Sequence, residues 1–139
     1  MGMSAKARQN LMWLEKYQKE CGVLLSQFID VIKPMLYNFT NSSLEVSVGV
    51  TTSNNGFISL LTSKTNNLLL RAEEVSNGDI KLHFCDADYI INTMFVVNLS
   101  CINLFNMEKF EFVSQGFTVY TAHFTYMNVK YYLKLKVKN

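Results

Sequence analysis

The residues whose types and spacing could do chemistry lie in the segment His83-Phe84-Cys85-Asp86-Ala87-Asp88. In a strand, His83 and Cys85 would point to the same face, where they could share a metal ion or act as base and nucleophile. A metal would need further ligands, for which only His123 and distant acids are available, and a Cys-His nucleophile would need oxyanion donors that no motif supplies. Aspartates after a strand are also typical of turns, because their carboxylates bond nearby backbone amides. We therefore favour a strand that enters an Asp-rich turn, and keep a polar cluster of His83, Cys85, Asp86 and Asp88 as the lesser alternative.

A second candidate is the segment 129–138, in which mostly lysine positions alternate with mostly apolar positions. In a strand, one face would carry a basic row with neighbouring positions about 6–7 Å apart: Lys130, Tyr132, Lys134, Lys136 and Lys138. Such a row could bind phosphates or an acidic partner, but lysines also protect exposed strands against edge-to-edge aggregation. The chain has 13 basic and 11 acidic residues and a formal net charge of only +2, without a second basic patch. Edge protection is therefore the favoured interpretation, and nucleic acid is not an expected partner.

Aromatic residues are concentrated in the last third of the chain: Phe110, Phe112, Phe117, Tyr120, Phe124, Tyr126, Tyr131 and Tyr132. They could line a cavity for a small apolar ligand between a helix and a sheet, which would make the protein a carrier or sensor. They could equally fill a solid core or an interface. The sequence leaves both alternatives open, and no phosphate-binding glycine loop or cofactor motif is present.

The element that precedes these candidates is a predicted amphipathic helix over residues 5–33. Apolar residues repeat every three to four positions, and only Gln18 is polar in the series. The residues of the stripe are Leu11, Leu14, Cys21, Leu25, Phe28, Ile32 and Met35. We expect one helix of about seven turns, which Pro34 ends or kinks near Ile32.

The stripe is narrow before Cys21 and broad after it, which predicts different tasks for the two halves. The second half is expected to lie in the domain core. The first half is surplus to that core and is the predicted surface for a partner: Leu11, Trp13, Leu14, Tyr17 and Gln18. The leading hypothesis is thus a non-enzymatic interaction protein without a cofactor, a homodimer that also binds another protein in an assembly, adaptor or inhibitor role.

After Ser43 the apolar residues alternate by two, which predicts strands. The expected strands are 44–51, 57–63, 68–75, 80–85, 110–113, 117–126 and 129–137, with the first four forming an antiparallel meander. Asn54-Asn55-Gly56, Asn66-Asn67, Asn77-Gly78 and Met127-Asn128 are expected turns. Residues 89–105 favour a strand, although Asp88 could cap a helix there.

These elements predict one α+β domain over residues 1–139, with the helix over 5–33 and an antiparallel β-meander of seven or eight strands over 43–138. The helix would cover the sheet, which could be barrel-like. Three cysteines without a Cys-x-x-Cys pair, no apolar run of membrane-spanning length and a polar N-terminus indicate the reducing cytoplasm and no membrane association. The abundance of Asn and Lys suggests an AT-rich genome, such as that of a virus or phage.

Overall fold

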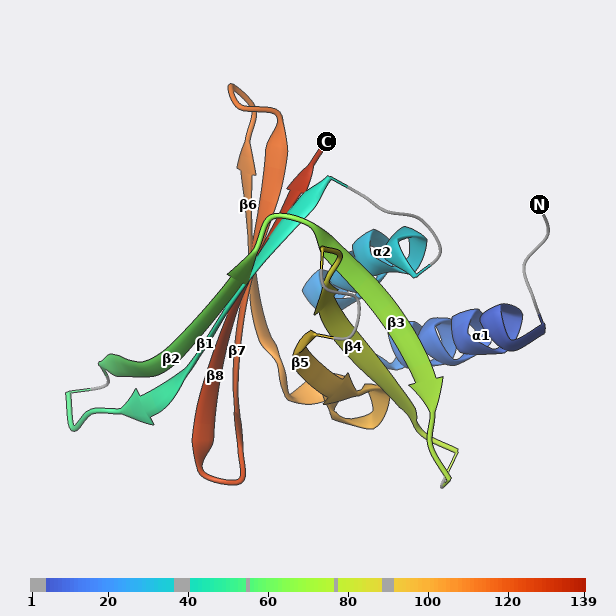
Figure 1. Cartoon of the computed structure of the whole chain (residues 1–139), viewed down its shortest axis with the longest axis horizontal. Helices are drawn as coiled ribbons and strands as arrows, with labels where there is room; N and C mark the ends of the chain where they lie inside the picture. The colour runs from blue at the N-terminus through green and yellow to red at the C-terminus, as the bar shows by residue number, and fades with distance from the viewer. Residues whose placement is uncertain (1–4, 37–40, 55, 77, 89–91) are drawn as a thin grey trace.

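The computed structural model describes residues 5–36, 41–54, 56–76, 78–88 and 92–139. Two helices come first, α1 (Ala5–Glu20) and α2 (Val23–Met35). The strands are β1 (Ser42–Thr51), β2 (Phe57–Thr65), β3 (Leu68–Glu74), β4 (Ile80–Asp86), β5 (Thr93–Asn98), β6 (Asn106–Phe112), β7 (Phe117–Tyr126) and β8 (Val129–Lys138), with a 3₁₀ helix, η1 (Leu99–Leu104), between β5 and β6. The α+β class with an eight-stranded antiparallel architecture is confirmed for the described residues (Figure 1).

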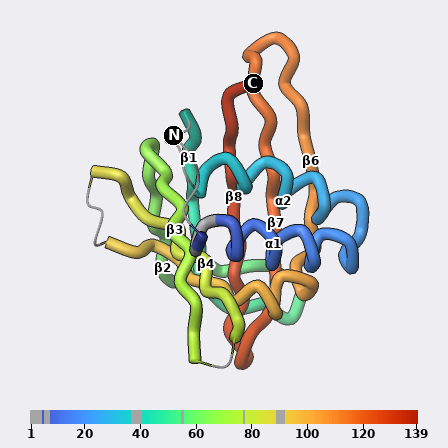
Figure 2. Tube along the Cα trace, turned by 90° about the vertical axis from the view of Figure 1, so that its right-hand side faces the viewer, coloured from blue at the N-terminus to red at the C-terminus, as the bar shows by residue number. Residues whose placement is uncertain are grey.

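The prediction of one continuous helix is wrong, because the helix is interrupted at Cys21 and Gly22. Gly22 is extended, with φ −71° and ψ 171°, and its carbonyl accepts the Ser26 N–H at 2.9 Å to start α2. Glycine weakens a helix interior by about 1 kcal/mol relative to alanine, so a turn is favoured at this position. The two helices run side by side across β6, β7 and β8 (Figure 2), and buried apolar residues of both helices belong to the common core. α2 continues one residue past Pro34 and ends at Met35.

The eight strands divide between two sheets, which corrects the expectation of a single meander. The larger sheet has the order β2-β1-β8-β7-β6, and the smaller has the order β3-β4-β5. The chain leaves the larger sheet at Asn66-Asn67 and returns to it at β6, so β1 pairs with both β2 and β8. The barrel is not closed, because the two sheets stand at an angle and share no ladder (Figure 1).

The core lies between the larger sheet on one side and the helices and smaller sheet on the other. Ile29 and Ile32 of α2, Leu82 of β4 and Leu135 of β8 are at most 2% exposed. The rings of Phe28 in α2 and Tyr120 in β7 meet edge to face, with centroids 5.8 Å apart. Burial of these apolar residues is the main force that fastens the layers together.

Some predicted connections take a different form in the structure. Residues 93–98 form β5 as expected, but 99–104 form a 3₁₀ helix rather than more strand, and residues 89–91 lie outside the described residues. Met127 and Asn128 have φ values of 50° and 66°, which are typical of the tight turns that suit hairpins. The turns at Asn54-Asn55-Gly56 and Asn77-Gly78 each contain one residue outside the described set, although Gly78 has the expected positive φ of 83°.

Candidate functional site

The lysine strand β8 lies in the centre of the larger sheet, not at its edge. It pairs with β1 on one side and with β7 on the other over nearly its whole length. Leu133 and Leu135 point into the core and are 3% and 2% exposed, so the lysines that alternate with them point to the opposite face. We call this opposite face of the five strands the outer face, and no described helix or strand covers it (Figure 1). Edge protection is therefore the wrong interpretation of the lysine row.

Positive charge predominates on the outer face. The strand register places five lysines there and two glutamates: Lys64, Lys130, Lys134, Lys136 and Lys138, with Glu45 and Glu108. The ion pairs found among the described residues do not include any of the four β8 lysines. These ammonium groups are thus available to an anionic partner, although the net charge of the chain is small.

Aromatic rings flank the lysines in two groups. At one end, Tyr132 lies between Phe57 and His123, with centroid distances of 6.1 and 6.3 Å. Gly49 of β1 makes room for the Phe57 ring, because its missing Cβ would lie 3.0 Å from Phe57 Cε2. At the other end, Phe112 and Phe117 are 5.3 Å apart, and Phe110 lies beside them on β6. We call these the Tyr132 group and the Phe117 group.

Two adjoining hollows mark the Phe117 end of the outer face. One, of about 370 Å³, is lined mainly by apolar residues and by Lys134 and Lys136. The other, of about 270 Å³, is lined by amide and hydroxyl side chains and by Lys136 and Lys138. The hollows share Gln115, Phe117 and Lys136, and the Lys136 amino group lies 3.8 Å from the centre of the Phe117 ring. A hydrophobic and a polar subsite thus stand side by side.

The predicted partner surface on the helix is largely used by the protein itself. Leu14 is only 1% exposed, which excludes it as a contact for a partner in this fold. Trp13 and Tyr17 stack at 6.1 Å and pack against the core, and Leu11 is half-buried. Burial is the first cause that raises the pKa of the Tyr17 phenol, and the carboxylates of Asp79 and Glu20 add to it. The expectation of a surplus stripe fails because the break at Gly22 folds α1 back over the domain.

The Gln18 side chain forms hydrogen bonds within its own chain, in place of the predicted contact with a partner. Its amide donates to Asp30 Oδ1 at 2.7 Å and to the Ser26 carbonyl at 3.0 Å, and its oxygen accepts from Lys33 Nζ at 2.5 Å. The side chain therefore ties α1 to α2. Among the described residues of α1 and α2, the large apolar residues that are exposed are Met12, Val23 and Leu24.

β2 forms an exposed apolar surface that the sequence pattern does not predict. β2 is an outer strand of the larger sheet, and its residues Ile58, Leu60 and Leu61 are 52%, 69% and 64% exposed. The ladder with β1 shifts between Val48 and Gly49, so Leu60 is an inserted residue of a β-bulge. Two successive leucines in an otherwise alternating segment were the available signal.

His83 and Cys85 contact different residues and do not form a common site. His83 Nε2 lies 3.1 Å from Glu73 Oε2, while Cys85 is fully buried and its sulfur is 3.7 Å from Thr93 Oγ1. His83 Nδ1 has no hydrogen-bond partner in the described part of the chain. His123 belongs to the larger sheet, where it stacks on Tyr132, so the two histidines do not converge. Within the described residues, no three metal-ligating side chains come together.

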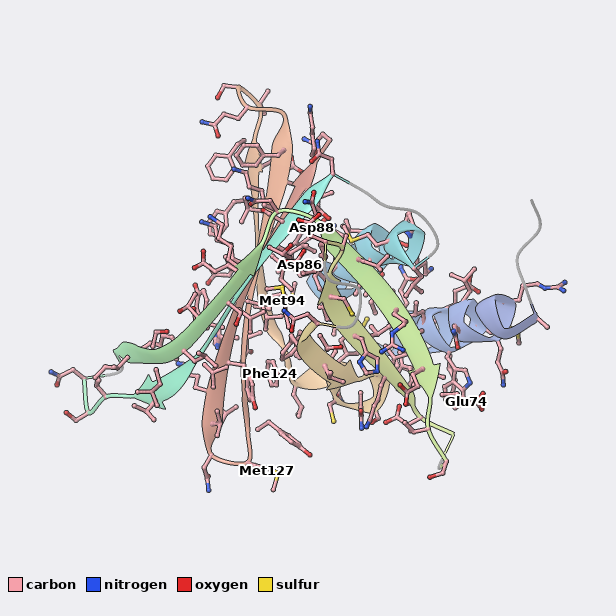
Figure 3. The ribbon with its side chains drawn as sticks, in the orientation of Figure 1. Glu74, Asp86, Asp88, Met94, Phe124 and Met127 are labelled. Atoms are coloured by element: carbon pink, nitrogen blue, oxygen red, sulfur yellow. The ribbon has the colours of Figure 1, made fainter. Side chains whose placement is uncertain are left out.

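Asp86 and Asp88 lie at the end of β4, as Figure 3 shows. Asp86 Oδ1 accepts the Asp88 N–H at 3.0 Å, and Asp88 Oδ2 accepts from the Asn67 amide at 3.0 Å. Both carboxylates thus bond local groups of a turn.

The aromatic residues of the last third serve both the core and the surface. Tyr120 and Phe124 are buried, and Phe124 stacks on Tyr131 at 4.9 Å and meets Phe95 of β5 at 5.8 Å. Figure 3 shows Phe124 on the β7 side that faces β5. Phe28 and Ile32 are 3% and 0% exposed and line none of the hollows described here. Side chains therefore fill the space at Phe28 and Ile32, whereas a hollow of about 560 Å³ adjoins the start of α2 and is lined by residues 20–25, Asn103 and residues 105–107.

Comparisons of the chain with protein-family models, with curated proteins and with solved structures found no match. No helix among the described residues has both the length and the apolar character needed to cross a membrane. The physical character of the surfaces is thus the basis for a functional proposal.

Proposed function

We propose that this protein is a non-enzymatic interaction module that forms a homodimer through the exposed edge of β2. The observation that carries the proposal is the combination of a free strand edge with the exposed side chains of Ile58, Leu60 and Leu61. A strand at the edge of a sheet presents backbone N–H and C=O groups that can pair with another strand. The three free cysteines suit the reducing cytoplasm as the place of action.

The other edges differ from β2 in length or charge. β6 and β3 each carry three charged residues, which discourage pairing with another strand: Glu108, Lys109 and Glu111 in β6, and Arg71, Glu73 and Glu74 in β3. β5 has no charge but only six residues, against nine in β2. β2 is therefore the longest of these edge strands, and Lys64 is its single charged residue.

A second copy of the chain fits this edge because β2 is compatible with itself. Antiparallel pairing about a two-fold axis would place the exposed leucines of both copies beside one another and join the larger sheets. The two Lys64 side chains would be opposite each other only if the axis passed through that residue. The outer faces of both copies would then form one continuous surface, available to a macromolecular partner.

Sedimentation equilibrium over a range of protein concentrations tests the dimer. The wild-type chain should approach twice its mass of 16.0 kDa. Leu60→Lys and Leu61→Lys should give folded monomers, because both side chains are exposed in the single chain and a charge placed there opposes edge pairing. Val113→Lys is the matched control, since Val113 is 90% exposed and lies outside β2.

A wild-type chain that stays monomeric at all concentrations would refute the proposal. Dimers that persist in both leucine variants would place the interface elsewhere. Circular dichroism of each variant confirms that the fold is retained.

A further inference from the structure

We propose that the outer face binds single-stranded nucleic acid, with phosphates along the β8 lysines and bases on the Tyr132 and Phe117 groups. The inference uses only the face of one chain, so it does not depend on the homodimer. It also reverses the expectation from the sequence that nucleic acid is not a partner. That expectation rested on the small net charge and on edge protection, and β8 is a central strand.

The lysine row provides the electrostatic part of such a site. Lys134, Lys136 and Lys138 are exposed and follow one another at every second residue of a straight strand. The backbone positions that carry neighbouring lysines are therefore about 6–7 Å apart along the strand. A flexible polyanion can follow this row and gains free energy from the counterions that it releases.

The aromatic groups provide the stacking part. Tyr132, Phe112 and Phe110 are 39%, 43% and 46% exposed, although aromatic rings are usually buried in a core. Tyr132 and the Phe117 group are separated along β8 by six residues, or about 20 Å. Exposed rings at two points along a basic row match the arrangement with which proteins bind single strands, because every base offers a flat face to a ring.

The two adjoining hollows, one apolar and one polar, match the two parts of a nucleotide. The hollow lined by Phe110, Phe112 and Phe117 can accept a base, while the neighbouring hollow offers Lys138, Ser43 and Asn66 to a sugar or phosphate. Lys136 borders both hollows, which places its charge between base and phosphate. A site for ring and anion together is more specific than a basic patch alone.

Two other polyanions fit the face less well. An acidic protein would satisfy the lysines but would gain little from exposed flat rings. A duplex keeps its bases stacked inside, so it could use the charge but not the rings. Single strands alone use both features.

Fluorescence anisotropy with labelled oligothymidine and oligouridine of about a dozen nucleotides tests the proposal. We expect binding at low salt, and a plot of log affinity against log salt with a slope of about −3, since each of four neutralised phosphates contributes about −0.7. The two oligonucleotides distinguish DNA from RNA as the natural source of the strand. A duplex of the same length and polyglutamate serve as competitors.

Charge and stacking variants separate the two parts of the site. Lys134→Gln combined with Lys136→Gln should reduce the slope by about 1.4. Lys19→Gln combined with Arg71→Gln removes the same charge from exposed positions outside the outer face, and should leave the slope unchanged. Tyr132→Leu and Phe112→Leu should weaken binding about 5- to 150-fold each, with the slope retained, because they remove stacking but no charge. The leucine replacements keep an apolar side chain on the strand.

Three results would overturn the proposal. The first is no binding of either oligonucleotide at low salt. The second is equal competition by duplex or polyglutamate, which would identify a simple polyanion or acidic-protein surface. The third is an equal effect of the two lysine-pair variants, which would show attraction to the chain as a whole. Salt-dependent binding that needs both the β8 lysines and the rings would support it.

Discussion

Gly49→Ala should destabilise the protein, because β1 and β2 approach closely at this residue. Gly49 pairs with Ser59 at the point where the ladder shifts register. A methyl group there would overlap the carbonyl oxygen of Ile58, and it would also lie 2.9 Å from the Ile58 carbonyl carbon and 3.0 Å from Phe57 Cε2. The obstacle is backbone of the neighbouring strand, which cannot rotate away as a side chain could.

The size of the effect follows from two opposing contributions. Overpacking costs about 1–3 kcal/mol, and a backbone obstacle favours the upper end of that range. Restriction of the unfolded chain by alanine returns about 0.4–1 kcal/mol. We therefore expect a net loss of about 2 kcal/mol in the free energy of unfolding, or roughly a 30-fold change in the folding equilibrium constant.

Gly22→Ala is the matched control for this prediction. A Cβ at Gly22 would meet no atom within 4 Å, and the φ of −71° is accessible to alanine. It should raise the free energy of unfolding by about 0.4–1 kcal/mol, because only the restriction of the unfolded chain remains. Urea denaturation followed by circular dichroism and by the fluorescence of Trp13 measures both variants. The close-approach argument fails if Gly49→Ala is as stable as the wild type, or if both glycine variants lose the same stability.

Two further predictions concern the core. Leu14→Asp should unfold the chain rather than release a monomer, because it places a carboxylate at a position whose side chain is 1% exposed. The expected loss in the free energy of unfolding is more than about 3 kcal/mol. Met12→Asp is the control and should be nearly neutral in the same urea assay, because Met12 is 69% exposed. A folded Leu14→Asp variant would contradict the buried position of α1. Burial raises the pKa of the Tyr120 phenol above its ordinary value of 10.0, so the stability that its protonated form contributes is complete below about pH 10 and is lost as the pH rises further. The urea midpoint should thus fall less steeply above pH 10 in Tyr120→Phe than in the wild type, and identical pH profiles would show that the phenol is not responsible.

The local elements of this fold were mostly predictable because they depend on near neighbours in the sequence. Alternation by two identified β1 to β4, β7, β8 and the end of β6, which begins at Asn106 rather than at residue 110. The turn at Met127-Asn128 has the positive φ values that such residues tolerate. The apolar stripe likewise identified the helical segment. The break at Gly22 is not evident from the sequence, since a single glycine is tolerated in many helices and α1 packs against α2 only in the folded domain.

The candidate surfaces were harder to predict because exposure depends on partners distant in the chain. The narrow stripe predicts a partner surface, whereas the domain itself covers its residues fully or in part: Leu11, Trp13, Leu14 and Tyr17. Leu60 and Leu61 showed only an interrupted alternation, and their exposure follows from the outer position of β2. The lysine pattern of β8 was plain, but its meaning depended on whether the strand lay at an edge or in the centre.

The sequence by itself determined which residues share a face of each strand, since side chains alternate whatever the neighbours are. It therefore determined that the lysines of β8 form one row opposite Leu133 and Leu135. Only the tertiary structure decided where that row lies. β8 pairs with β7 on one side and, on the other, with Ser42–Gly49 of β1, which lie about ninety residues earlier in the chain. Pairing between such distant segments is selected by the burial of the whole core rather than by local preference, and it turns a possible edge strand into the centre of an open, basic and aromatic face.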